Sequence, residues 1–167
     1  MIMIISGVYF SRSVLATAAL LLSLSLFLAC GKDDPESQAK KDRQILLKYI
    51  SDNDLDAHEV DDTGVFYVIN KEGNGGFPTA DSHVLVKNEG YYFDDDEELE
   101  LFQPLTTNLY HLKNMILGWQ YGIPKFNRGA KGLLLIPSGY GYGPYSYYTG
   151  IPPNSVLLYE IEMEDFN

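Results

Sequence analysis

Cysteine, histidine and basic side chains are scarce in this sequence of 167 residues. The single cysteine excludes a disulfide framework and any zinc or iron–sulfur site built from several cysteines. Only 12 bases face 23 acids, and the net charge of −11 argues against nucleic acid as a partner, because phosphates need a basic surface. The three histidines form no HExxH pair, and no Gly-x-Ser-x-Gly sequence occurs. The sequence therefore gives little support to hydrolytic catalysis.

Apolar and turn-forming residues are plentiful. Apolar residues make up 46% of the chain, which is enough for the core of one ordinary domain. The 13 tyrosines, 15 glycines and 8 prolines favour a fold rich in strands and turns. The acidic run Asp94–Glu98 is expected to form a solvated hairpin. Asp52–Asp56 has the first ligand spacings of a calcium loop but lacks its glycine and glutamate, so no metal is expected.

The N-terminus has the pattern of an export signal. Residues 14–29 carry no charge and are too short for a typical membrane span, which needs about 20 apolar residues. The only cysteine, Cys30, follows directly after Ala29, and this arrangement resembles a bacterial lipoprotein signal. The resemblance implies a cleaved signal at 1–29, lipidation of Cys30, a solvated tether at 30–35, and a lipid anchor in a cell envelope membrane, with the outer membrane favoured. A signal anchor with an incidental cysteine is the alternative.

Periodicity divides the remainder into a helix and a strand-rich domain. Residues 36–51 have a helical pattern with an apolar stripe of Ala39, Leu46, Tyr49 and Ile50, followed by an acidic linker to residue 62. Residues 63–167 predict an α+β domain with an antiparallel sheet. Its expected strands are Val65–Lys71, His83–Gly90, Gly132–Ile136 and Val156–Met163, and its expected short helix is Gly118–Ile123. Leu133 and Leu135 would face away from the domain core, and we expect residues 36–51 or a second subunit to cover them.

Three segments of the C-terminal third resemble one known family. They read MILGWQYGIP at 115–124, GLLLIPSGYGYGP at 132–144 and GIPPNSVLLYEIEMEDF at 150–166. Their order and spacing are similar to those of FKBP-type peptidyl-prolyl cis–trans isomerases. The resemblance implies a half-barrel sheet wrapped on a short helix, with the N-terminal helix as an addition. It also implies action on proline-containing polypeptides, in folding of exported proteins, without cofactor or metal. We expect a monomer.

The same resemblance assigns roles to individual residues. Trp119 matches the floor beneath the proline ring, Tyr142 the loop hydroxyl that donates to the ligand, and Ile116 the backbone N–H that meets the substrate carbonyl. The residues that match apolar or aromatic contacts to the substrate are Met115, Ile151 and Tyr159. On spacing alone, Trp119 and Tyr159 could simply be core residues, which is the commoner role for such aromatics.

The first half of the expected pocket departs from the family pattern. Asn88 stands where a tyrosine is usual, and we expect its amide to lie near the pocket and to need polar partners. The family's Phe-Asp pair is missing, and Phe102 and Leu105 are both candidates for an unplaced aromatic or apolar wall. Two alternatives therefore stay open: a binding module with weak or no catalysis, and a glycan-binding surface that uses Tyr145–Tyr148.

Overall fold

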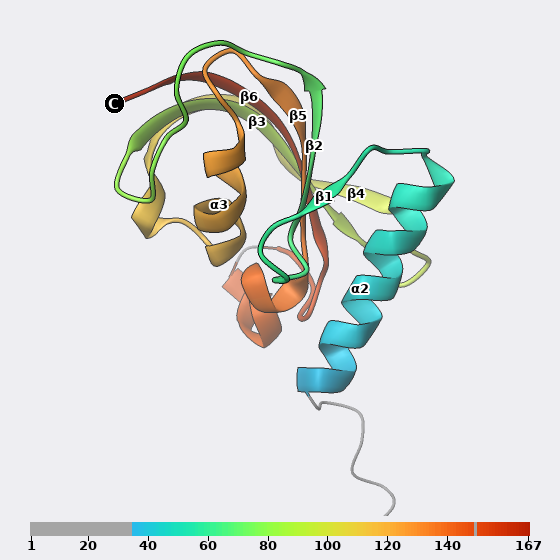
Figure 1. Cartoon of the computed structure of the whole chain (residues 1–167). Coiled ribbons are helices and arrows are strands. Elements are labelled where there is room, and N and C mark those ends of the chain that lie inside the picture. Colours follow the sequence, from blue (N-terminus) through green and yellow to red (C-terminus); the bar gives the residue numbers. More distant parts are fainter. Residues whose placement is uncertain (1–34, 149) are drawn as a thin grey trace, which may run out of the picture. The chain divides into compact units, whose positions relative to one another are not determined.

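The computed structural model describes residues 35–148 and 150–167, which form one compact unit from Pro35 to Asn167 (Figure 1). The expected signal at 1–29 and the expected lipidation site Cys30 lie outside the described residues. Within the described residues, no helix combines the length and the apolar character that a membrane crossing requires.

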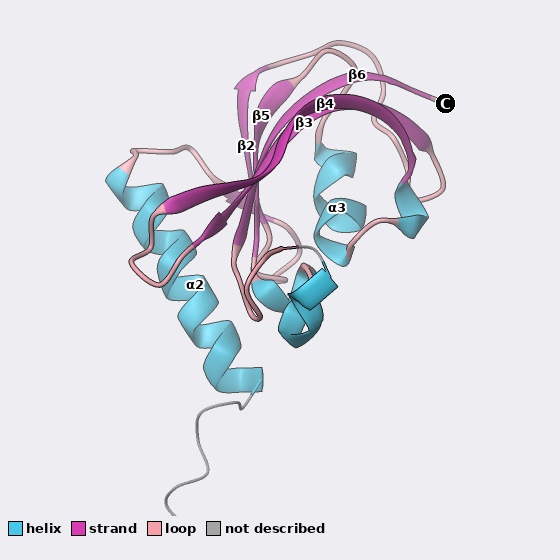
Figure 2. Cartoon of the chain, turned by 180° about the vertical axis from the view of Figure 1, so that it is seen from behind, coloured by secondary structure: helices cyan, strands magenta, loops and turns pink. Residues whose placement is uncertain are grey.

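The domain is built on one antiparallel sheet with the strand order β1-β2-β5-β6-β3-β4 (Figures 1 and 2). The sheet and its short helix confirm the expected α+β fold. The strands are β1 (His58–Glu59), β2 (Phe66–Lys71), β3 (His83–Phe93), β4 (Leu99–His111), β5 (Lys131–Ile136) and β6 (Leu157–Phe166).

Helix α3 (Leu117–Gly122) lies in the curve of the sheet (Figure 2). Two glycines allow this close packing. A Cβ at Gly118 would lie 2.4 Å from Ile136, and one at Gly122 would lie 2.1 Å from Leu134. Strand β6 turns Leu157, Tyr159, Ile161 and Met163 to the same core, as its alternating sequence predicts.

Helix α2 (Pro35–Asp52) covers the opposite face of the sheet near β2 and β5 (Figure 1). Leu46 is fully buried against Leu135, and Leu133 is partly buried in the same cluster. Burial of a leucine contributes about 1.5–3 kcal/mol to stability. The expectation that residues 36–51 cover the two outer leucines of β5 is confirmed. Because β5 is packed on both faces, its sequence is an unbroken apolar run.

The expected stripe of α2 was partly wrong. Ala39 is exposed, whereas Asp42 is buried and Ile45 is half-buried on the covered face. The sequence misleads here because a carboxylate occupies a core-facing position, where it has specific partners. The helix is also tied to β1 by a two-pronged ion pair, in which Arg43 contacts Glu59 at 2.7 and 2.8 Å.

Strand β4 was not predicted from the sequence, and β3 is longer than expected. The pairing of β3 with β4 shifts register between Asn88 and Gly90 and again between Gly90 and Tyr91. Each shift places an extra β4 residue opposite β3, which destroys the alternation that sequence patterns detect. Asp94–Glu98 connects the two strands as the expected hairpin turn.

Candidate active site

The floor of the candidate site is Trp119 on α3. Its side chain is 1% exposed, and its indole N–H has no hydrogen-bond partner among the described residues. Tyr159 of β6 meets it edge-on, with ring centres 5.3 Å apart. Tyr110 of β4 meets it at 5.1 Å. Three distant segments therefore bring their rings together beside α3.

One wall is formed by Phe102 of β4. Its ring lies edge-on to Tyr159 at 5.6 Å and to Tyr142 at 6.4 Å. Gly90 makes this approach possible, because a Cβ there would lie 2.7 Å from the Phe102 ring and 3.0 Å from Tyr159. The structure therefore selects Phe102 over Leu105 as the aromatic wall. Leu105 is 57% exposed and faces away from these rings, toward a groove on the other side of the sheet.

Tyr142 and Tyr159 interact through their hydroxyl groups. Burial raises the pKa of Tyr159 above its ordinary value, and the neighbouring hydroxyl of Tyr142 raises it further, with a smaller contribution from Tyr110. Tyr159 is therefore a neutral phenol at every physiological pH. Tyr142 is half-buried at the rim, where a phenolic hydroxyl can reach a bound ligand.

The turn before α3 presents a backbone donor. The Ile116 carbonyl accepts hydrogen bonds from the N–H groups of Trp119 and Gln120, at 3.0 and 3.2 Å. Within residues 35–148 and 150–167, the Ile116 N–H has no partner. The Gln120 side-chain amide donates to the Met115 carbonyl at 2.8 Å, which fixes the turn. Met115 and Ile116 are both half-buried against the core that contains Trp119.

Ile151 is placed with the same group of residues. It is 3% exposed and belongs to the same core cluster as Trp119 and Tyr159. Its loop is closed by a hydrogen bond from the Asn154 N–H to the Gly143 carbonyl at 2.9 Å. Six of the expected site residues therefore gather around one cluster: Met115, Ile116, Trp119, Tyr142, Ile151 and Tyr159.

Asn88 lies deeper than a contact residue would. It is fully buried, and its amide nitrogen donates to the Tyr110 hydroxyl at 3.2 Å and to the Val86 carbonyl at 3.4 Å. The Gln103 side chain donates to its carbonyl oxygen. The expected need for polar partners is met within the protein. A direct bond from Asn88 to a substrate would require these partners to move.

An acid on α2 fixes the loop that carries Tyr142, and sequence reasoning missed it. The Asp42 carboxylate, 1% exposed, accepts hydrogen bonds from the Ser138 N–H at 2.9 Å and from its hydroxyl at 2.7 Å. The Gln38 amide donates to the other oxygen at 2.7 Å. Ser138 opens the turn Ser138–Tyr140 (η4), which leads into Tyr142. No local pattern could show this contact, because its partners are 96 residues apart.

The tip of this loop is exposed at Tyr145, which is 82% accessible. The side chains of residues 146–148 lie outside what the structure describes, so the proposed tyrosine surface stays a prediction.

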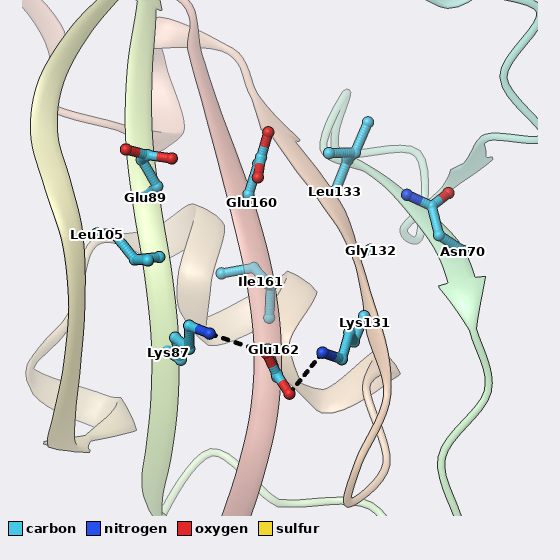
Figure 3. Close-up of a pocket in the computed structure, with 10 residues that line it drawn as sticks. All are labelled: Asn70, Lys87, Glu89, Leu105, Lys131, Gly132, Leu133, Glu160, Ile161 and Glu162. Carbon is cyan, nitrogen blue, oxygen red and sulfur yellow. Dashed lines mark ion pairs between the residues drawn. The ribbon is translucent and has the colours of Figure 1, made fainter.

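A hollow of about 410 Å³ lies on the outer face of the sheet (Figure 3). At one end, Glu162 pairs with Lys131 at 2.7 Å and with Lys87 at 3.6 Å. At the other end, Glu89 and Glu160 are direct cross-strand neighbours. The hollow combines charged side chains at its ends with the apolar residues Leu105, Leu133 and Ile161, and it contains none of the expected site residues.

Comparison with known proteins agrees with this geometry. Residues 75–164 match the family described as "FKBP-type peptidyl-prolyl cis-trans isomerase". The chain is 34% identical over 107 residues to FkpA of Buchnera aphidicola, a match that covers 62% of this chain and 41% of the relative. It is 32% identical over 108 residues to a peptidyl-prolyl cis-trans isomerase of Schizosaccharomyces pombe, covering 62% of this chain and 96% of the relative.

Solved structures give the same assignment. The crystal structure of a peptidyl-prolyl cis-trans isomerase from Pseudomonas syringae superposes with a TM-score of 0.65 at 27% identity, covering 82% of this chain and 99% of that one. FkpA of Escherichia coli shares the fold, with a TM-score of 0.61 at 24% identity over 93% of this chain and 70% of that one. The chain belongs to the family of FKBP-type peptidyl-prolyl cis-trans isomerases.

Proposed function

We propose that this chain catalyses cis–trans isomerisation of X–Pro peptide bonds in exported polypeptides. The observation that carries the proposal is the convergence of Trp119, Tyr159, Phe102 and Tyr142 beside an Ile116 N–H that has no partner in the described chain. The family membership of the chain supports the same reaction.

The chemistry requires no nucleophile. The barrier of about 18–20 kcal/mol arises from amide resonance, which a planar peptide bond loses as it twists. In the proposed complex the proline ring lies against the aromatic rings, so the amide leaves water. A less polar surrounding favours the twisted amide, whose charge separation is smaller than that of the planar form. The site thus binds the transition state better than the ground state.

Two donors would orient the substrate. The Ile116 N–H would bond the substrate carbonyl, and the Tyr142 hydroxyl would bond a neighbouring backbone carbonyl. Hydrogen bonds from fixed donors need no reorganisation during the reaction. Because the Tyr142 bond is one of two and neutral, its loss should slow the reaction only slightly, whereas loss of the indole floor should slow it strongly.

A protease-coupled assay on an Ala-Leu-Pro-Phe peptide tests the proposal. The parent chain should accelerate the slow phase, Trp119→Leu should lower kcat/KM by at least about tenfold, and Tyr142→Phe by less than about threefold. Phe77→Leu replaces an aromatic residue that is 56% exposed and outside the cluster, and it should behave like the parent. Folded parent protein with activity equal to buffer would exclude the isomerase.

One observation favours a second function. The buried Asn88–Gln103–Tyr110 network occupies the wall where the family usually has a tyrosine. A protein with this altered wall could bind proline peptides without accelerating their isomerisation. Saturable binding of the peptide without any change in its cis–trans exchange would establish this function instead, and a gain in turnover from Asn88→Tyr would support it further.

We further propose that the domain is held at a cell envelope membrane through a lipid on Cys30. The support is the uncharged run of residues 14–29 directly before this cysteine. The full chain should incorporate radiolabelled palmitate, and Cys30→Ser should abolish labelling. Equal labelling of both would contradict the anchor.

A further inference from the structure

Strand β4 is an edge strand with an exposed apolar stripe. It ends the strand order and pairs only with β3 in the described sheet. Leu101, Leu105 and Leu109 are 51%, 57% and 67% exposed, and none of them belongs to either core cluster of the described chain. These three residues form the leucine stripe. Exposed leucines at the open edge of a sheet indicate an interaction surface.

The three leucines lie on one face of the sheet. Leu109 is directly opposite Leu85, and Leu101 is opposite Tyr91, two β3 residues that point away from Trp119. Leu105 lines the outer groove beside Lys87 and Glu89 (Figure 3). The leucine stripe therefore runs along the outer face, separate from the candidate active site on the inner face.

The spacing of the leucine stripe is symmetric about Leu105. Leu105 lies four positions after Leu101 and four positions before Leu109. If two copies of β4 run antiparallel with Leu105 facing Leu105, each Leu101 lies beside the other copy's Leu109. A two-fold contact of this kind is isologous, because the same patch serves both partners. The stripe thus fits a second copy of itself.

The charges at the ends of β4 favour the same antiparallel arrangement. The acidic turn Asp94–Glu98 precedes the strand, and its other end carries His111 and Lys113, the latter 4.0 Å from Asp81. In the antiparallel pair, the acidic turn of one copy lies beside this lysine-bearing end of the other. A parallel arrangement would set acids against acids, which costs free energy. Charge complementarity therefore selects the two-fold arrangement.

We propose that the chain forms a reversible homodimer by antiparallel, edge-to-edge association of β4 around Leu105. The two register shifts of β4 and the missing N–H of Pro104 interrupt its hydrogen-bonding edge. These irregularities limit the backbone ladder and keep the association weak. The leucine stripe supplies most of the contact. This proposal departs from the monomer expected from the sequence.

Cysteine cross-linking tests both the dimer and its register. The experiment uses cells that express the full chain with Cys30→Ser, so that the introduced thiol is the only one in the chain. Leu105→Cys should form a disulfide-linked dimer on mild oxidation, because directly opposed strand residues have Cα atoms about 4.5–5.5 Å apart, within disulfide range. Leu101→Cys and Leu109→Cys should stay monomeric when expressed separately. Co-expressed, the two should cross-link to each other.

Leu47→Cys is the matched control, because Leu47 is 44% exposed but lies on α2. Cross-linking of Leu105→Cys at the level of Leu47→Cys would overturn the proposal. Self-cross-linking of Leu101→Cys would overturn the register, and a disulfide from position 105 to a different protein would assign the stripe to that partner instead.

Sedimentation in detergent is a second test. Leu105→Lys should raise the dimer Kd at least tenfold, and Leu47→Lys should not change it. An equal Kd for all three chains would also refute the dimer.

Discussion

Replacing Asp42 by alanine is expected to destabilise the domain and to loosen the loop that carries Tyr142. The Asp42 carboxylate accepts two hydrogen bonds from Ser138, at 2.9 and 2.7 Å, and one from Gln38 at 2.7 Å. Asp42 and Ser138 are 1% and 2% exposed, so water does not readily replace the lost acceptor. Alanine would leave both donors of Ser138 without a partner.

The magnitude follows from those two donors. Each buried donor that loses its acceptor costs roughly 1–3 kcal/mol, and bonds to a charged acceptor lie at the upper end of the range. For two donors, we expect Asp42→Ala to lower the free energy of unfolding by roughly 2–6 kcal/mol. Asp42→Asn keeps one acceptor oxygen, so its free energy of unfolding should lie between those of the parent chain and Asp42→Ala. Removing both partners, in Asp42→Ala with Ser138→Ala, should cost less than the sum of the single changes.

Urea unfolding provides the assay. Trp119 is the only tryptophan, so its fluorescence reports on the site and on the fold at once. Asp56→Ala is the control, because the Asp56 side chain is 97% exposed and its loss should change stability by less than about 0.5 kcal/mol. The reasoning would be refuted if Asp42→Ala unfolded at the same urea concentration as Asp56→Ala. At low urea, where all variants are folded, Asp42→Ala should also lower isomerase kcat/KM.

Three further outcomes are expected. Gly90→Ala should lower the free energy of unfolding by about 1–3 kcal/mol and alter Trp119 fluorescence, because the new Cβ would lie only 2.7 Å from the Phe102 ring. Gly76→Ala is the control, because a Cβ there meets open space. Equal melting temperatures for the two variants would contradict the close packing at Gly90. Phe102→Ala should reduce isomerase kcat/KM by about tenfold while Leu105→Ala leaves it unchanged, and equal effects would show that Phe102 is not the wall. Arg43 lowers the pKa of Glu59, so this pair stabilises the fold above the unfolded-state pKa of about 4.3 and loses its effect as pH falls through the folded-state value. Glu59→Gln should therefore cost about 0.5–1 kcal/mol at pH 7 and progressively less as the pH falls below about 4 in urea titrations, and a cost independent of pH would refute the ion pair.

The sequence predicted those parts of the fold whose patterns are local. Strand β6 alternates between Tyr159 or Ile161 on one side and Glu160 on the other, so its inner face could be read directly. The short helix and the strand β5 were also located, and the two outer leucines of β5 correctly indicated a covering helix. Each of these features depends on residues close together in the chain, which periodicity can detect.

The missed features depend on geometry that periodicity cannot carry. Two one-residue shifts in β4 change which side chains face inward, so Phe102 could not be chosen over Leu105 from the sequence. The role of Asp42 depends on a partner 96 residues away. Asn88 was correctly expected to need polar partners, but its depth beneath Tyr110 and Gln103 is set by three strands together. These are tertiary properties of the sheet.

The most direct test of the account is the rate at which an X–Pro peptide exchanges between cis and trans in the presence of this chain. Exchange spectroscopy by NMR measures that rate without a coupling protease. If Trp119, Tyr159, Phe102 and Tyr142 act on the prolyl bond as proposed, catalytic amounts of the folded chain will speed the exchange, and Trp119→Leu will remove most of the gain. Exchange at the uncatalysed rate, beside protein whose Trp119 fluorescence shows it to be folded, would contradict the central claim.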